Sequence, residues 1–294
     1  MKIENCKLKI IFFGSSKYST IVASSLHRKI GLTAVVTLPD APIGRHKTIT
    51  PNPVKTFAQE NNIPYITTDK LDNETIGEIS DLQPDFLVIA DYGRILPKEL
   101  LALPKYAPIN IHHSLLPKYR GSSPASSAIL AGEKTSGVTI IEMGQKVDAG
   151  DILAQKEYIL KNNETKESLL TALNTIGSEI IIPVLHEYIQ GKIKKIPQDH
   201  AKATYTQKIK KPGGFIDINN PPSLEHLDRM IRAYYPWPTT WTKLELSPNI
   251  WKIVKLLPEN KIQVEGGKPM TIKDFLNGYP QLKEKLKKLL TNIT

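Results

Sequence analysis

The chain has 294 residues, 40% of them hydrophobic, which is long enough for two domains, and it has no apolar run approaching the roughly 20 residues that cross a membrane. Its one cysteine, Cys6, excludes an internal disulfide framework and a cysteine-cluster zinc site. The net charge is +10, and the excess lies in the last third: basic and acidic residues number 20 each over residues 1–191, against 19 and 9 over residues 192–294. This asymmetry suggests a bound polyanion in that part, with a lysine-rich surface kept for solubility as the alternative.

The first half of the chain alternates between buried-strand and helix patterns. Residues 1–7 lack the apolar segment and cleavage site of a secretory signal, so we expect a cytoplasmic protein. A strand over 8–13, a helix over 18–29 and a strand over 32–37 form a βαβ unit, followed by a helix over 53–61 and strands over 85–90 and 108–112. The alternation predicts an α/β domain whose Rossmann-like, mostly parallel sheet is covered on both faces.

Three polar segments follow strands of this predicted sheet. They are Gly14, residues 91–93 and residues 110–112, and ligands of parallel sheets bind beyond the carboxyl ends of the strands. Two further strands, over 138–143 and 151–155, are expected to form a hairpin whose loop returns Asp148 to this crevice. A helix over 165–190 completes the domain, which we place at residues 1–190.

The last third has a different pattern. Residues 191–206 are basic and irregular and are interpreted as a linker. Beyond them, residues 207–294 contain short β segments at 214–217, 241–246, 251–257 and 261–265, separated by Pro, Asn and Gly. We expect a smaller C-terminal β-barrel domain of the OB-like type, with a helix over 223–233. An amphipathic tail with Leu282, Leu286 and Leu289 on one side is expected to dock on this domain.

Asn110 and His112 are the first candidates for chemistry. Side chains alternate across a strand, so an amide and an imidazole share one face, although an isolated Asn-x-His is more often a solvated strand end. Other kinds of site find less support. The Gly14 turn lacks both G-x-G-x-x-G and a P-loop, so it either borders an extended substrate or is a structural turn. His112 and His113 point apart, which disfavours a metal site, and Ser114 lacks a G-x-S-x-G elbow.

Four motifs together resemble the formyltransferases that use 10-formyltetrahydrofolate. They are Asn110-x-His112, residues 114–121 (SLLPKYRG), residues 135–139 (TSGVT) and residues 148–151 (DAGD). Within that family the chain is most similar to the methionyl-tRNA formyltransferases, through residues 44–47 (GRHK), 50–55 (TPNPVK) and 232–241 (RAYYPWPTTW). The resemblance extends over nearly the whole chain.

The resemblance implies a function and a set of residues. The formyl group of 10-formyltetrahydrofolate would pass to the α-amino group of initiator methionyl-tRNA for translation initiation, without a metal, and we expect a monomer. The residues it implies as catalytic are Asn110, His112 and Asp148. Those it implies for folate binding are Ser114, Leu115, Leu116 and Pro117, with the loop around Ile89 and Tyr92. Arg45 and Lys47 match a loop that approaches the tRNA acceptor stem.

The chemistry assigns physical roles to these groups. Attack of a neutral amine on the formyl carbon makes the formyl oxygen negative, and Asn110 and His112 can donate to it. Asp148 would orient His112 and help to remove the proton from the nitrogen. An α-amino group has a pKa of about 7.7 to 8, so positioning should carry much of the rate without a strong base.

Two other functions stay open. The Asn, His and Asp set is shared with formyltransferases that act on glycinamide ribonucleotide and sugar nucleotides, so formylation of an amino-sugar nucleotide is the alternative. A third reading is an RNA-binding protein with a disused transferase domain. The aromatic residues Tyr234, Tyr235, Trp237 and Trp241 are interpreted as a packing core and not as an RNA-stacking surface.

Three residues near the predicted crevice depart from the family pattern. Ser16 stands where proline is common, Asp91 precedes Tyr92-Gly93 where a small residue is expected, and His113 replaces a small residue or proline. Asp91 would either be a buried charge beside the pterin or accept hydrogen bonds from its amino-pyrimidine edge. His113 is expected to point away from His112 and to pack.

Overall fold

The computed structural model describes residues 8–43 and 48–290, so Cys6, Arg45 and Lys47 lie outside the described residues. The chain forms two compact units. Unit 1 comprises Met1–Ser122, Ser136–Tyr158 and Leu170–Tyr205, and unit 2 comprises Ser123–Thr135, Ile159–Leu169 and Thr206–Thr294. The division into domains at 190 and 207 stays a prediction, since compactness alone does not show which segments fold independently.

Unit 1 is built on a seven-stranded sheet in the order β5-β2-β1-β6-β7-β8-β9. The strands are β1 (Ile10–Phe13), β2 (Ala34–Thr37), β5 (Tyr65–Thr67), β6 (Phe86–Ile89), β7 (Ala107–His112), β8 (Thr135–Glu142) and β9 (Ile152–Ile159). The pairs from β5 to β7 are parallel, whereas β8 runs antiparallel to β7. All four residues of β1, β2 and β6 are buried, as expected for strands covered on both faces. The predicted mostly parallel, Rossmann-like sheet is confirmed.

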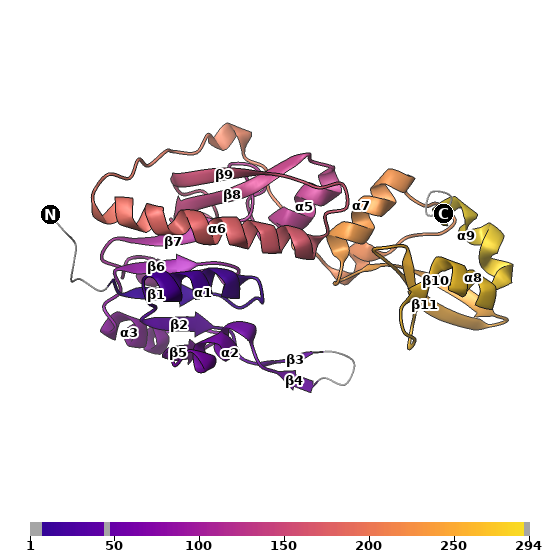
Figure 1. Cartoon of the computed structure of the whole chain (residues 1–294), viewed down its shortest axis with the longest axis horizontal. Helices are drawn as coiled ribbons and strands as arrows, with labels where there is room; N and C mark the ends of the chain where they lie inside the picture. The colour runs from indigo at the N-terminus through magenta and orange to yellow at the C-terminus, as the bar shows by residue number, and fades with distance from the viewer. Residues whose placement is uncertain (1–7, 44–47, 291–294) are drawn as a thin grey trace. The chain divides into compact units, whose positions relative to one another are not determined.

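Helices cover this sheet (Figure 1). They are α1 (Ser19–Lys29), α2 (Pro53–Glu60), α3 (Asn73–Asp81), α4 (Lys98–Leu101) and most of α6 (Lys166–Ile189). Gly177 of α6 lies against Ile111 of β7, where a β-carbon would come within 2.7 Å of the Ile111 side chain. The Ile109 and Ile111 face of β7 is therefore the face that α6 covers.

The sequence patterns missed several elements of unit 1. They include α3, α4, the short edge strand β5, and a two-stranded ribbon of β3 (Ala41–Ile43) and β4 (Thr48–Thr50). These segments are short and partly exposed, so they carry weak hydrophobic periodicity. Helix α6 also qualifies the expectation about membranes, because it is the one described helix whose length and composition would suffice to cross one. It is 44% buried over its most apolar window, and a long core helix meets the same criterion.

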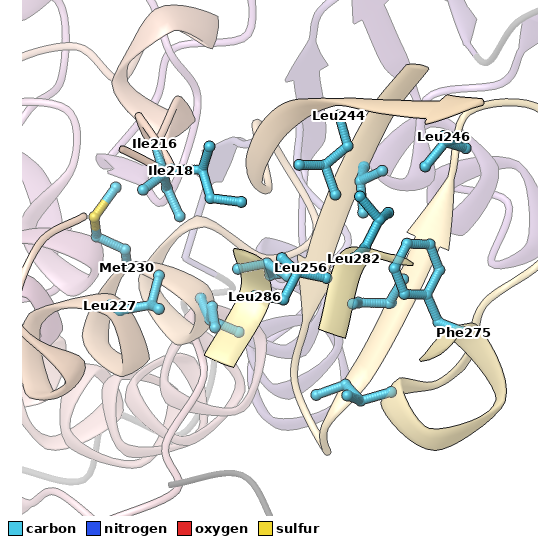
Figure 2. Close-up of a cluster of buried hydrophobic side chains, with 14 residues drawn as sticks. Ile216, Ile218, Leu227, Met230, Leu244, Leu246, Leu256, Phe275, Leu282 and Leu286 are labelled. Atoms are coloured by element: carbon cyan, nitrogen blue, oxygen red, sulfur yellow. The ribbon is translucent and has the colours of Figure 1, made fainter. Parts of the chain in front are cut away.

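Unit 2 contains a four-stranded antiparallel sheet. Its strands are β10 (Thr240–Ser247), β11 (Ile250–Leu257), β12 (Lys261–Val264) and β13 (Met270–Thr271), and its helices include α5 (Pro124–Ala131), α7 (Leu224–Tyr234), α8 (Ile272–Gly278) and α9 (Lys283–Leu290). Figure 2 shows side chains from the sheet, α7 and the C-terminal helices meeting in one cluster, with Leu244, Leu256 and Phe275 among them. Leu282 and Leu286 are buried in it, so the tail packs on this unit as expected.

Two expectations for unit 2 need correction. The segment 214–217 is no strand of the sheet: a short 3₁₀ turn, Lys211–Gly214, leads to a single bridge between Phe215 and Trp241. The aromatic cluster is only partly a packing core. Tyr234 packs against the core, but Trp237, which lies in a turn between two prolines, is 53% exposed.

Candidate active site

Asn110 and His112 lie at the carboxyl end of strand β7. Ile89, the last residue of β6, pairs with Asn110, while β8 places Thr139 opposite His112. Both side chains reach the same carboxylate: Asn110 Nδ2 donates to Asp148 Oδ1 over 3.3 Å, and His112 Nδ1 lies 3.6 Å from that oxygen. Residues two apart on a strand share a face, which explains why they converge.

Asp148 lies in the loop between β8 and β9. Its other carboxylate oxygen, Oδ2, accepts a hydrogen bond of 2.7 Å from the backbone N–H of Gly121. The Asp148 backbone is left-handed (φ 49°), and at Gly150 a β-carbon would overlap the Glu142 carbonyl oxygen. A left-handed non-glycine residue is held in place only by surrounding contacts, so this loop has one conformation that presents the carboxylate to β7.

Gln198 holds the same loop from outside the sheet. Its Nε2 donates to the carbonyl oxygens of Asp148 (2.9 Å) and Gly150 (2.7 Å). The buried guanidinium of Arg120 donates in turn to Gln198 Oε1 through Nε (3.2 Å) and Nη2 (2.6 Å). Sequence reasoning missed Gln198, because no local pattern relates it to a loop 50 residues earlier. The segment interpreted as a linker thus contributes directly to the site.

The environment of His112 favours its uncharged form. The ring is 5% exposed, and its Nε2 lies 3.0 Å from the Tyr119 carbonyl oxygen, which can only accept, so the proton of the neutral ring sits on Nε2. Burial lowers the pKa of His112 and outweighs the opposing effects of the Asp148 carboxylate and the Tyr119 carbonyl. The Nδ1 lone pair of the neutral ring then faces Asp148, ready to take up a proton that the carboxylate would stabilise.

His113 faces the opposite side of the sheet, as strand alternation predicts. Its Nδ1 lies 3.3 Å from Asp91 Oδ1, and the ring is 4% exposed. Burial lowers the pKa of His113, but the Asp91 carboxylate more than compensates, so the pKa is raised overall. Burial likewise raises the pKa of Asp91, and its charged and hydrogen-bonding partners reverse the shift. Two adjacent histidines therefore have opposite charge preferences, each set beside its own aspartate.

The residues expected to bind folate lie in varied settings. The Ser114 hydroxyl donates to the Lys118 carbonyl oxygen over 2.7 Å, and the Leu116 N–H donates to Thr139 Oγ1 over 3.1 Å. These bonds shape the turn after β7 that carries Leu115 and Pro117. Ile89 and Tyr92 are part of the buried hydrophobic core of unit 1, so their side chains pack inward.

Burial raises the pKa of the Tyr92 phenol to about 12. Among the described residues, no cluster of three or more His, Cys, Asp or Glu side chains could hold a metal ion.

Comparisons with known proteins agree with the fold. Residues 8–185 match the family model described as "Formyl transferase". Among solved structures, a 4-N formyltransferase from Francisella tularensis superposes with a TM-score of 0.64 at 20% identity, covering 87% of this chain and 99% of that one. An N-formyltransferase from Helicobacter canadensis, solved with folinic acid and dTDP-3-aminofucose, gives 0.62 at 18% identity, with coverages of 90% and 98%. At these identities the likeness concerns the fold.

Relatives found by sequence similarity indicate the family more narrowly than these structures do. A methionyl-tRNA formyltransferase of Listeria monocytogenes is 39% identical over 246 residues, which cover 83% of this chain and 78% of that protein. One from Enterococcus faecalis is 34% identical, with coverages of 93% and 96%. The chain belongs to the formyltransferase family, and within it to the methionyl-tRNA formyltransferases.

Proposed function

We propose that this protein transfers the formyl group of 10-formyltetrahydrofolate to the α-amino group of initiator methionyl-tRNA, as a soluble cytoplasmic monomer. The observation that carries the proposal is the convergence of Asn110 and His112 on Asp148 in a chain so similar to methionyl-tRNA formyltransferases. In the reaction the amine nitrogen bonds to the formyl carbon, the bond from that carbon to the folate nitrogen breaks, the amine loses a proton and the departing folate nitrogen gains one.

Asn110 suits the stabilisation of the formyl oxygen. Its Nδ2 gives one hydrogen to Asp148 and carries a second, and the bond to Asp148 fixes the amide orientation. A donor fixed before the substrate arrives stabilises developing negative charge without reorganisation. The Nε2–H of His112 is a second donor, but it already donates to the Tyr119 carbonyl oxygen. To reach the formyl oxygen it must leave that carbonyl oxygen or donate to both oxygens at once.

The His112 and Asp148 pair suits the removal of the amine proton. The neutral ring presents Nδ1 towards Asp148, so a proton taken up by Nδ1 would be stabilised by the charge of a carboxylate oxygen 3.6 Å away. Arg45 and Lys47 remain candidates for contact with the acceptor stem, and the folate would bind beside residues 114–117 and the end of β6.

An assay with two acceptors tests the proposal. The purified protein, given 10-formyltetrahydrofolate, is expected to formylate methionyl initiator tRNA, and His112→Ala to lower kcat by a factor of about 10² to 10³. His27→Ala, in a helix distant in sequence, is the matched control. Turnover of an amino-sugar nucleotide with none of the tRNA would reject the proposal. A His112→Ala variant that loses formyl transfer and still keeps the protein's biological activity would point to a role in RNA binding alone.

A further inference from the structure

A second polar cluster, with His113 and Asn174 buried and Asp91 and Ser16 partly buried, lies on the face of the sheet opposite Asp148. Asp91 accepts hydrogen bonds through Oδ2 from the Ser16 hydroxyl (3.1 Å) and from Asn174 Nδ2 (3.3 Å), while its Oδ1 faces His113 Nδ1. Both carboxylate oxygens are thus engaged by the protein's own groups. This arrangement disfavours the expectation that Asp91 accepts directly from the edge of a pterin.

The cluster joins the carboxyl ends of three adjacent strands. Ser16 follows β1, Asp91 follows β6 and His113 follows β7, and these are neighbours in the sheet in that order. Asn174 adds helix α6. Ligands of parallel sheets bind beyond this edge, so the cluster links three of the segments at the end of the sheet where a ligand is expected.

The backbone at Asp91 is strained in the way that such a cluster would stabilise. Asp91 has φ 49° and Gly93 has φ 79°, so the chain turns sharply after β6 through two left-handed residues. A left-handed residue with a β-carbon is unfavourable, and it persists where surrounding contacts favour it. Between these residues, Tyr92 is anchored in the core beside Phe13, with ring centroids 5.4 Å apart. The turn is thus held on both sides.

The side chains of the cluster are chemically complementary to one another. Ser16 Oγ accepts from the backbone N–H groups of Tyr18 and Ser19 and donates to Asp91, so it also joins the start of α1 to the cluster. Among the described residues, His113 Nε2 and Asn174 Oδ1 are buried without a hydrogen-bond partner, and they are a donor and an acceptor. Asn174 also contributes to the raised pKa of His113. The cluster is therefore suited to an aspartate and an imidazolium that neutralise each other.

We propose that Asp91, His113, Ser16 and Asn174 are positioning residues that hold the turn after β6 in its folate-binding conformation, and so set affinity for the folate and not the rate of the chemical step. This inference rests on the proposed folate-dependent transfer. It adds to that function a group of side chains on the opposite face of the sheet from Asn110, His112 and Asp148.

The test is the separation of KM from kcat in variants of Asp91. Asp91→Ala is expected to raise KM for 10-formyltetrahydrofolate about tenfold, as loss of one or two hydrogen bonds to a charged group would. We expect kcat and KM for tRNA to change less than about threefold, because the Asn110 site is untouched. Asp91→Asn keeps the shape and can pair with a neutral His113, so it should recover most of the affinity.

Asp91→Gly separates the cluster from the backbone conformation. Glycine removes the cost of the left-handed turn, so this variant would keep its folate affinity if only that conformation mattered. The proposal predicts that Asp91→Gly is impaired like Asp91→Ala. Asn174→Ala, a milder change, should raise KM about threefold, and Thr175→Ala, on the exposed side of the same helix, is the matched control.

Direct titration of each variant with 5-formyltetrahydrofolate, a stable folate, measures affinity without turnover. Folate KM and Kd within twofold of wild type in Asp91→Ala would overturn the inference, as would equal losses in kcat and in both KM values. If Asp91→Ala fails to fold, Asn174→Ala decides by the same criteria, with Thr175→Ala as its control. A wild-type protein that neither binds this folate nor transfers formyl groups would reject the proposed function itself, a result distinct from normal binding in the variants.

Discussion

His112 and His113 are neighbours in the sequence with opposite electrostatic roles. Strand alternation sends one ring towards Asp148 and the other towards Asp91. The difference lies in the partners: the Asp148 oxygen near His112 is 3.6 Å away and also accepts from Asn110, whereas Asp91 approaches His113 to 3.3 Å. The pKa of His112 is therefore lowered, by burial, and that of His113 is raised by Asp91.

The lowered pKa of His112 predicts the pH dependence of the reaction. A group whose folded pKa is depressed stays neutral down to a lower pH, so His112 should lose its active form only below 6.5, the ordinary histidine value. The substrate amine, with a pKa of about 7.7 to 8, should cause the first decline as pH falls. Single-turnover rates from pH 5 to 9 measure both. Titration of His112 itself above 6.5 would contradict the assignment.

The charge of Asp148 is expected to matter more than its shape. Asp148→Asn is nearly isosteric and can still accept from Gly121, but it cannot stabilise a proton on His112. Loss of a group acting in proton transfer typically costs about 10² to 10⁴ in rate, so kcat should fall by that order while the melting temperature changes little. Asp151→Asn, in the neighbouring turn, serves as the control. A fall of less than tenfold would leave Asp148 a structural role only.

At the scale of elements, the loop between β8 and β9 positions the carboxylate. Gly150→Ala would place a methyl group on the Glu142 carbonyl oxygen, so the loop must move and carry Asp148 with it. We expect kcat to fall by about 10². Gly144→Ala, in the same loop, meets nothing within 4 Å and should behave as wild type. Kinetics and melting temperatures of the two variants check this, and equal behaviour of the pair would contradict it.

At the scale of the whole molecule, segments of the two compact units alternate along the chain, so a truncation between them divides unit 2. Helix α5 belongs to unit 2, where it packs on α7 and Ser126 Oγ donates to the Ala233 carbonyl oxygen over 3.0 Å. A fragment of residues 1–206 would expose the apolar side of α5, so we expect it to aggregate or to melt well below the full chain. Light scattering and thermal unfolding of the fragment test this. A monomeric fragment as stable as the full chain would show that α5 does not need α7.

The charge asymmetry predicts a selective effect of salt. All of the excess of basic over acidic residues lies in residues 192–294. Contacts between cationic side chains and phosphates weaken as salt ions compete for them. Raising ionic strength from about 50 to 200 mM should increase KM for tRNA far more than KM for the folate. Steady-state kinetics at four salt concentrations provide the slopes. Equal salt dependence of the two KM values would contradict binding of the tRNA by the basic region.

Much of the fold could be predicted from local pattern. The runs at β1, β2 and β6 are continuously apolar because both of their faces are buried, and α6 is a long, largely apolar segment. Elements at the margin, such as β5 and the β3–β4 ribbon, escaped because few of their side chains are buried. Trp237 shows that local pattern does not determine the burial of a single side chain. Its aromatic side chain among other aromatic residues predicted a place in a packing core, but it is exposed.

The residue types and spacing of Asn110 and His112 were enough to predict that they share a face, because alternation is a local property of any strand. Which groups face them depends on contacts between distant segments. Gln198 and Arg120 hold the Asp148 loop, and Asp91 pairs with His113, through a sheet order that places β6 between β1 and β7. Local pattern thus indicated the candidate groups, whereas their charges and orientations arise from burial and long-range hydrogen bonds that form only in the folded chain.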